Sequence, residues 1–132
     1  WLAGGFGSLH RVNGDEVALK ISTGVSSSLN ALARQGDRVI AVGDGGIVLE
    51  IDSQDDVIRR HEQSGLFLYG VASSGTQSVA VGWSGTALVF SDNDLIEEDT
   101  GTTQILEAVW FDGADAVAVG RTGSVFLRQE TP

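Results

Sequence analysis

The sequence predicts an all-β fold made of repeated four-stranded antiparallel units. A glycine motif, Ala-Val-Gly-x-x-Gly, recurs along the chain at a nearly constant spacing of about 39 residues. Short runs of Val, Ile, Leu and Phe alternate with clusters of Gly, Asp, Asn and Ser, which is the composition of strands and turns. The 132 residues contain one proline and no convincing apolar pattern of period 3.6, so few helices are expected. Four strands in about 40 residues is the size of a β-propeller blade.

The repeat is anchored by the first glycine of the motif. These glycines stand at Gly4, Gly43, Gly82 and Gly120, which are spacings of 39, 39 and 38 residues. The surrounding segments align as three clear copies and one weaker copy, at 39–48, 79–87, 116–125 and 2–9. A leucine that begins an earlier apolar run keeps the same spacing, at Leu29, Leu68 and Leu106. The whole unit therefore repeats, and not the glycine motif alone.

Each unit is predicted to contain four short strands. In the second unit they are placed near 28–34, 38–43, 46–51 and 56–61. One position of the first strand holds a small residue, Ala31, Gly70 or Ala108, as expected where the innermost strands crowd towards the axis. Within the motif the chain must reverse in a two-residue turn, and glycine accepts the positive φ that such a turn needs.

The repeats describe one domain, 1–132, with two complete and two partial blades. The predicted boundaries are 1–24 and 104–132 for the partial blades and 25–64 and 65–103 for the complete ones. An open stack of blades would expose apolar faces and unpaired strand edges. We therefore expect a homo-oligomer, most simply a dimer, or a longer propeller from which this chain is a piece, as its start at Trp1 and its lack of methionine suggest. A β-trefoil is the alternative fold, but it requires three copies of the motif.

Composition excludes several classes of partner and site. A net charge of -10 repels phosphate backbones and anionic membranes, so neither nucleic acid nor a membrane is expected as a partner. The chain has no cysteine, His10 and His61 are isolated, and the acidic run at 92–99 lacks the spacing of a calcium loop. No metal and no cofactor is predicted. Because no nucleophile and base or carboxylate constellation is evident, the chain is predicted not to be an enzyme.

The repeat unit resembles that of a known class of propellers. The stretch from Ser64-Gly65 through Leu68, Val71 and 79–85 resembles the repeats of photosystem II assembly factors and bacterial relatives with BNR-like (Asp-box) repeats, over nearly the whole chain. The Asp-box turn itself is degenerate, because the matching stretches at 52–56 and 91–95 lack its paired glycines and tryptophan. The resemblance implies an interaction role of the assembly-factor kind instead of sialidase-like chemistry, and an exported setting.

The repeats differ most directly after the strand-ending glycine. These turns begin Gly5-Phe6, Asp44-Gly45, Trp83-Ser84 and Arg121-Thr122, and blade topology brings them to one face. Since Trp and Arg are typical contact anchors, we predict a binding face that carries Phe6, Asp44, Trp83 and Arg121. An indole in a two-residue turn is unfavourable unless it binds a ligand or packs, so packing of Trp83 on the neighbouring blade is the alternative.

The predicted function is a non-catalytic scaffold or binding module for a protein or peptide. A lectin-like or glycosidase-derived propeller, which would hold a sugar with Trp83 and nearby polar groups, is the alternative. A third hypothesis is a repeat that assembles with itself and has no ligand. Trp1 and Trp110 have strand-like surroundings and are expected to pack between blades.

Overall fold

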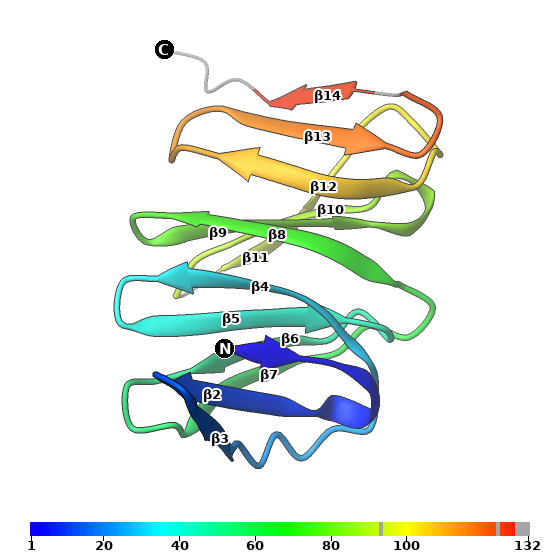
Figure 1. Cartoon of the computed structure of the whole chain (residues 1–132). Coiled ribbons are helices and arrows are strands. Elements are labelled where there is room, and N and C mark those ends of the chain that lie inside the picture. The colour runs from blue at the N-terminus through cyan, green and yellow to red at the C-terminus, as the bar shows by residue number, and fades with distance from the viewer. Residues whose placement is uncertain (93, 124, 129–132) are drawn as a thin grey trace.

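The computed structural model describes residues 1–92, 94–123 and 125–128. Its strands form four antiparallel sheets that follow one another along a stack (Figure 1). None of these residues lies in an α-helix, and the only helical elements among them are two short 3-10 turns. The all-β prediction is therefore confirmed.

The four sheets use the strands in chain order. The first contains β1 (Leu2–Ala3), β2 (Leu9–Asn13) and β3 (Glu16–Lys20). The second contains β4 (Leu29–Gln35), β5 (Arg38–Gly43), β6 (Val48–Ile51) and β7 (Val57–His61). The third contains β8 (Leu68–Ser74), β9 (Gln77–Gly82), β10 (Ala87–Phe90) and β11 (Leu95–Glu98). The fourth contains β12 (Leu106–Phe111), β13 (Ala116–Gly120) and β14 (Val125–Arg128), and the 3-10 turns are η1 (Gly5–Gly7) and η2 (Trp83–Gly85).

The two three-stranded sheets are incomplete copies of the four-stranded ones. In both complete sheets the motif glycine ends the second strand, at Gly43 in β5 and Gly82 in β9. Gly4 likewise follows β1, so the first sheet starts at the second strand of the unit, whereas β12 to β14 are the first three strands. Two complete and two partial blades were predicted, and this arrangement is a partial propeller, not the trefoil.

The core lies in three layers between neighbouring sheets. In β9 the side chains of Val79 and Val81 pack towards the fourth sheet, whereas Ala80 packs towards the second. Successive side chains of a strand point to opposite faces, so a strand with sheets on both sides is apolar throughout. This burial on both faces explains the unbroken Val-Ala-Val runs from which the repeat was found.

The innermost strands of adjacent sheets approach closely, as the small residues at their shared position predicted. A Cβ atom at Gly70 in β8 would lie 3.1 Å from the Cα of Ala108 in β12. The first strands β4, β8 and β12 lie side by side along one side of the stack (Figure 1). A large side chain at this position would push neighbouring blades apart.

The prediction for Trp1 and Trp110 was wrong within this chain. Trp110 is 56% exposed, because it lies on the face of the last sheet that no following sheet covers in the described residues. Trp1 is also exposed, at an edge of the stack beside Arg11 and Arg34. No helix of the described residues is long and apolar enough to span a bilayer.

Candidate functional site

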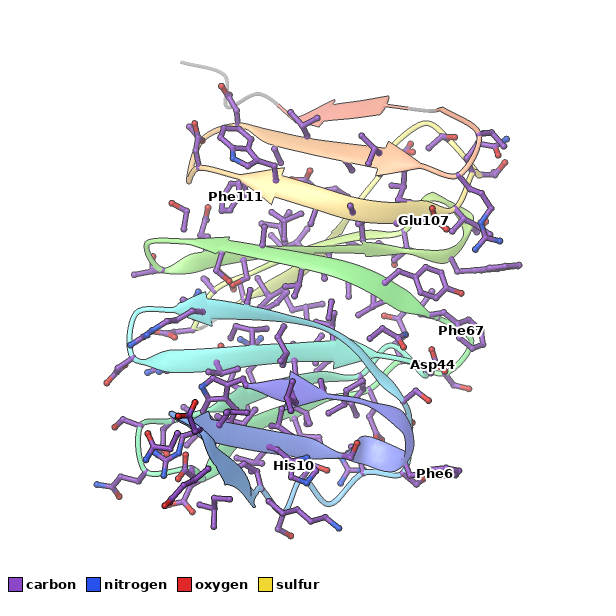
Figure 2. The ribbon with its side chains drawn as sticks, viewed as in Figure 1. Phe6, His10, Asp44, Phe67, Glu107 and Phe111 are labelled. Atoms are coloured by element: carbon purple, nitrogen blue, oxygen red, sulfur yellow. The ribbon has the colours of Figure 1, made fainter. Side chains whose placement is uncertain are left out.

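The predicted site residues all follow a motif glycine, at the turns between second and third strands. We call the edge of the stack that carries these turns the turn face. Figure 2 shows this edge with the labelled side chains of Phe6, Asp44, Phe67 and Glu107. Trp83 and Arg121 are at the equivalent turns of the third and fourth sheets. Phe6 is almost fully exposed.

The first three turns reverse the chain over two residues that both have positive φ. In η2 these are Ser84 (φ 55°) and Gly85 (φ 72°), and the turn is closed by a hydrogen bond from Thr86 N to Trp83 O of 3.1 Å. Consecutive positive φ values define the type I′ turn, whose twist matches that of the strands it joins. The residue before the pair, Trp83 in this blade, is consequently held at the tip of the second strand.

The first motif glycine is required for a different reason from the one predicted. Gly82 is extended (φ -173°), so positive φ does not explain it. A Cβ atom at Gly82 would instead lie 1.8 Å from the carbonyl oxygen of Phe67, in the segment that leads into β8. This close approach lets Trp83 N donate a 2.8 Å hydrogen bond to Phe67 O. At Gly85 both reasons apply, since a Cβ atom there would lie 1.9 Å from Thr102 O.

This close approach and its hydrogen bond, which we call the backbone clamp, bring two aromatic side chains together. The rings of Phe67 and Trp83 meet edge to face, with centroids 6.3 Å apart and an interplanar angle of 67°. Both stay accessible, at 39% and 47% exposure. Trp83 therefore packs against one neighbour while its remaining surface faces solvent, and we call these two side chains the aromatic pair.

In the flanking blades the residues equivalent to Trp83, which are Asp44 and Arg121, each take part in a polar side-chain pair. In the second sheet Asn30 Nδ2 donates to Asp44 Oδ1 at 2.9 Å, and in the fourth Arg121 Nε lies 3.0 Å from Glu107 Oε1. Each pair joins the start of a first strand to the turn after the second strand, 14 residues later. The same spacing relates Tyr69 to Trp83.

Sequence reasoning missed Phe67, Asn30 and Glu107. A spacing of 14 residues between the varied positions was present in the sequence and would have found Asn30 and Glu107. No sequence pattern marks Phe67, because its position depends on the close approach at Gly82.

An acidic hollow lies beside the η2 turn, next to the residue that follows Trp83. It has a volume of about 380 Å³ and is lined by Ser84 to Thr86, Glu97 to Thr100 and Thr102. Thr100 Oγ1 donates to Gly85 O at 2.7 Å, which fixes this segment against the turn. The acidic run noted in the sequence is thus divided, since Asp92 instead pairs with Arg38 at the opposite edge. No group of His, Asp and Glu suited to hold a metal ion occurs among the described residues.

The opposite edge carries a charged cluster between the second and third sheets, made of Arg38, Glu50, Arg59 and Asp92. Glu50 is only 3% exposed, and its Oε1 has no hydrogen-bond partner within the described part of the chain. Arg59 Nη1 lies 3.8 Å from Glu50 Oε2, and Arg38 Nη1 lies 2.6 Å from Asp92 Oδ1. Burial raises the pKa of Glu50, against the opposing effect of Arg59.

No family model matches the chain, and no curated protein matches it. Among solved structures, it is similar to the WD40 repeats of RRP9, with a TM-score of 0.67 and 15% identity over 83% of this chain and 41% of that one. It is also similar to BamB from Moraxella catarrhalis, with a TM-score of 0.64 and 13% identity over 94% of this chain and 43% of that one. The fold is that of a partial β-propeller.

The chain spans less than half the length of either propeller structure. At such low identity the likeness shows the fold alone. The resemblance to photosystem II assembly factors and BNR-like propellers is not shown by these matches and stays a prediction.

Proposed function

We propose that the chain is a non-catalytic interaction module whose turn face binds a protein or peptide. The observation that carries this proposal is the aromatic pair, which is half-exposed although its backbone is rigidly clamped. Exposed Trp and Phe side chains on a fixed backbone are typical of binding anchors, because little conformational entropy is lost when they are covered. The varied side chains around the pair, Asp44, Arg121 and Phe6, would then adjust specificity.

The charge around the aromatic pair favours a basic partner. Three carboxylate residues, Glu97, Glu98 and Asp99, line the hollow next to the turn that holds Trp83. A cationic side chain is attracted both to carboxylates and to the face of an indole ring. The partner that fits best is therefore a peptide segment that combines Lys or Arg with an apolar side chain.

Selection from a random peptide library displayed on phage, against the immobilised chain, tests this function. We expect enriched peptides with basic and apolar residues, and an at least tenfold loss of their affinity for Trp83→Ala. Ile96→Ala removes an exposed apolar side chain from the outer strand β11 and is the matched control, which should bind normally. Peptides that bind Trp83→Ala as tightly as the wild type would overturn the proposal.

A sugar ligand is the second candidate. The hollow beside Trp83 offers hydroxyl groups from Ser84, Thr100 and Thr102, and a sugar ring can stack on an exposed indole. A glycan array followed by titration with tryptophan fluorescence tests it. Saturable quenching that Trp83→Ala abolishes would favour the sugar over the peptide, and no response to any glycan would dismiss it.

We also propose that the chain completes its ring by self-association, most simply as a dimer, or within a longer propeller. Each end sheet leaves an apolar face uncovered in the described chain, with Leu2 at one end and Trp110 at the other. Two copies would supply eight sheets, within the usual range of about 4–8 blades. Light scattering on the purified chain should give twice the mass of one copy.

A further inference from the structure

The first strands of the second, third and fourth sheets share an irregularity near their start. The pairing register with the next strand shifts at Asn30 in β4, at Tyr69 in β8 and at Glu107 in β12. A shift of this kind re-aims the side chain at that position. Asn30 and Glu107 both use it to contact the residue that follows the motif glycine. In the third blade the equivalent residues are Tyr69 and Trp83, so the shared backbone places the tyrosine beside the tryptophan.

Two aromatic side chains approach Trp83 from the start of β8. Phe67 and Tyr69 flank Leu68, which is fully buried in the core between the second and third sheets. The two flanking side chains are only partly buried. The rings of Phe67 and Trp83 meet at an interplanar angle of 67°, which forms a corner, and Tyr69 adds a third ring next to it. We call Phe67, Tyr69 and Trp83 the aromatic cluster.

The second blade adds a carboxylate to the aromatic cluster. Asp44 pairs with Phe67 in an isolated antiparallel bridge, and both side chains lie on the turn face (Figure 2). Residues paired in this way have Cβ atoms about 5 Å apart. The carboxylate of Asp44 accepts a hydrogen bond from the neutral amide of Asn30, and it forms no ion pair with any cation of the described residues. Its negative charge therefore lies uncompensated beside the rings.

Three aromatic rings and one carboxylate suit a cation that carries methyl groups. The faces of the rings attract a positive charge, and methyl groups pack on them as apolar groups do. Within the aromatic cluster the hydroxyl of Tyr69 is the one side-chain hydrogen-bond acceptor, because Phe67 has no polar atom and the indole N–H of Trp83 only donates. An unmodified ammonium would lose the hydration of three N–H groups there, whereas a trimethylated ammonium has none to satisfy.

We infer that the aromatic cluster and Asp44 bind a methylated ammonium group, as carried by a methylated lysine side chain. The rings contact the methyl groups, and the carboxylate balances the charge of the nitrogen. All four residues belong to the two complete blades. The inference rests on the proposed binding of a basic peptide and names the cationic group that the peptide carries.

Three small probes separate the charge of the ligand from its shape. They are the N-acetyl methyl amides of trimethyl-lysine, of lysine, and of the neutral analogue in which carbon replaces the trimethylated nitrogen. Binding is followed by the NMR signal of the Trp83 indole N–H, which is identified by its loss in Trp83→Phe. We expect trimethyl-lysine to bind at least about tenfold more tightly than either other probe. Equal binding of the charged and the neutral probe would overturn the inference.

Variants of the site test which groups make it. Tyr69→Ala should weaken the binding of trimethyl-lysine about tenfold, whereas Tyr69→Phe, which keeps the ring, should retain it. Asp44→Asn keeps an acceptor for Asn30 but removes the charge, so only the charged probe should bind more weakly. Trp110→Ala removes an exposed indole outside the site and is the matched control. Circular dichroism checks folding, and Tyr69→Leu replaces Tyr69→Ala if that variant is unfolded. Unchanged binding in both Tyr69→Ala and Asp44→Asn would overturn the inference.

The peptides selected by phage display separate this inference from the proposed function. Synthesis of these peptides with trimethyl-lysine in place of lysine should raise their affinity about tenfold for the wild type, but not for Tyr69→Ala. Peptides that require Trp83 and gain nothing from trimethylation would overturn the inference while the proposed function stands. If the trimethyl-lysine probe binds but no peptide is selected, the methylammonium site stands and the peptide function is overturned; equal affinity for tetramethylammonium would then identify a free quaternary ammonium compound as the ligand.

Discussion

The two edges of the sheet stack hold neighbouring blades together in different ways. On the turn face backbone groups join neighbouring blades, as in the 2.9 Å hydrogen bond from Leu29 N to Gly4 O and the bridge that pairs Asp44 with Phe67. On the opposite edge side chains form the links, as in Arg38 with Asp92 and Gln35 Nε2 with Ser78 Oγ at 3.2 Å. Side chains on the turn face can therefore change between repeats without weakening the joints between strands. Side chains on the opposite edge cannot change in this way, because they themselves form the contacts between blades.

Replacement of a motif glycine should have the largest effect on the free energy of unfolding, because it disrupts the backbone clamp of the turn face. In Gly82→Ala the added Cβ would meet Phe67 O at 1.8 Å, and only movement of the backbone relieves the clash. We expect a loss of about 3 kcal/mol or more in the free energy of unfolding, measured by urea denaturation. Gly75→Ala is the matched control, since its φ is +60° but nothing lies within 4 Å of the added atom. A loss for Gly82→Ala no larger than that for Gly75→Ala would show that the close approach does not explain the first motif glycine.

Removal of Arg59 tests the side-chain links of the opposite edge. Arg59 accompanies the buried carboxylate of Glu50, donates to Ser91 O, and lies 5.9 Å from the centre of the Phe90 ring. Arg59→Ala would leave Glu50 buried without its counter-ion, so we expect a loss of about 2 kcal/mol. Arg60→Ala, next along β7, breaks an exposed pair with Glu62 and an exposed hydrogen bond to Gly24 O, and should lose less than about 1 kcal/mol. Similar losses in the two urea titrations would contradict a structural role for the charged cluster.

The pH dependence of stability tests one member of the same charged cluster, the buried carboxyl group of Glu50. Burial raises the pKa of Glu50 above its ordinary value of 4.5, so the folded state holds this proton more tightly than the unfolded chain. Its contribution to stability is complete below the unfolded pKa and is lost as pH rises through the folded pKa. Glu50→Gln should remove this decline in the free energy of unfolding, as measured by urea denaturation between about pH 4 and about pH 8. The charged groups that face Glu50 are Arg59, Arg38 and Asp92, and all three are retained in the variant.

A second carboxyl group, whose pKa is lowered instead of raised, serves as a control. Hydrogen bonds from the backbone N–H groups of Ala114 and Asp115 lower the pKa of Asp112. This group stabilises the fold above its unfolded pKa, and the contribution is lost as pH falls through the lower folded pKa. Asp112→Asn should therefore flatten only the acid side of the profile. A Glu50→Gln profile that coincides with the wild type would show that Glu50 stays charged in the folded protein.

The repeat, the strands and the turn face could be predicted because they follow from local rules. Alternation over two residues and turn chemistry fix strands within one unit, and a constant spacing transfers them to the next. Three features could not be predicted, because each depends on contacts between segments that are distant in the sequence. Phe67 meets Trp83 only through the approach at Gly82, and Glu50 is buried only because the third sheet covers it. Trp110 is exposed because none of the described residues covers that face of the fourth sheet. Sequence patterns report the surroundings of a strand within its blade, but not whether the next blade is present.

Apart from the control variants, the smallest expected effect on stability is that of Trp83→Ala, although this residue is the largest on the turn face. Its indole is half-exposed and contacts the Phe67 ring in an edge-to-face arrangement that contributes about 1 kcal/mol. The backbone hydrogen bond from Trp83 N to Phe67 O does not involve the side chain and should persist in the variant. Urea denaturation should therefore give a loss of about 1 kcal/mol, below that of Arg59→Ala. A loss as large as that of Gly82→Ala would mean that the indole, and not the backbone, holds the turn, and the side chains of this face would then not be free to serve a partner.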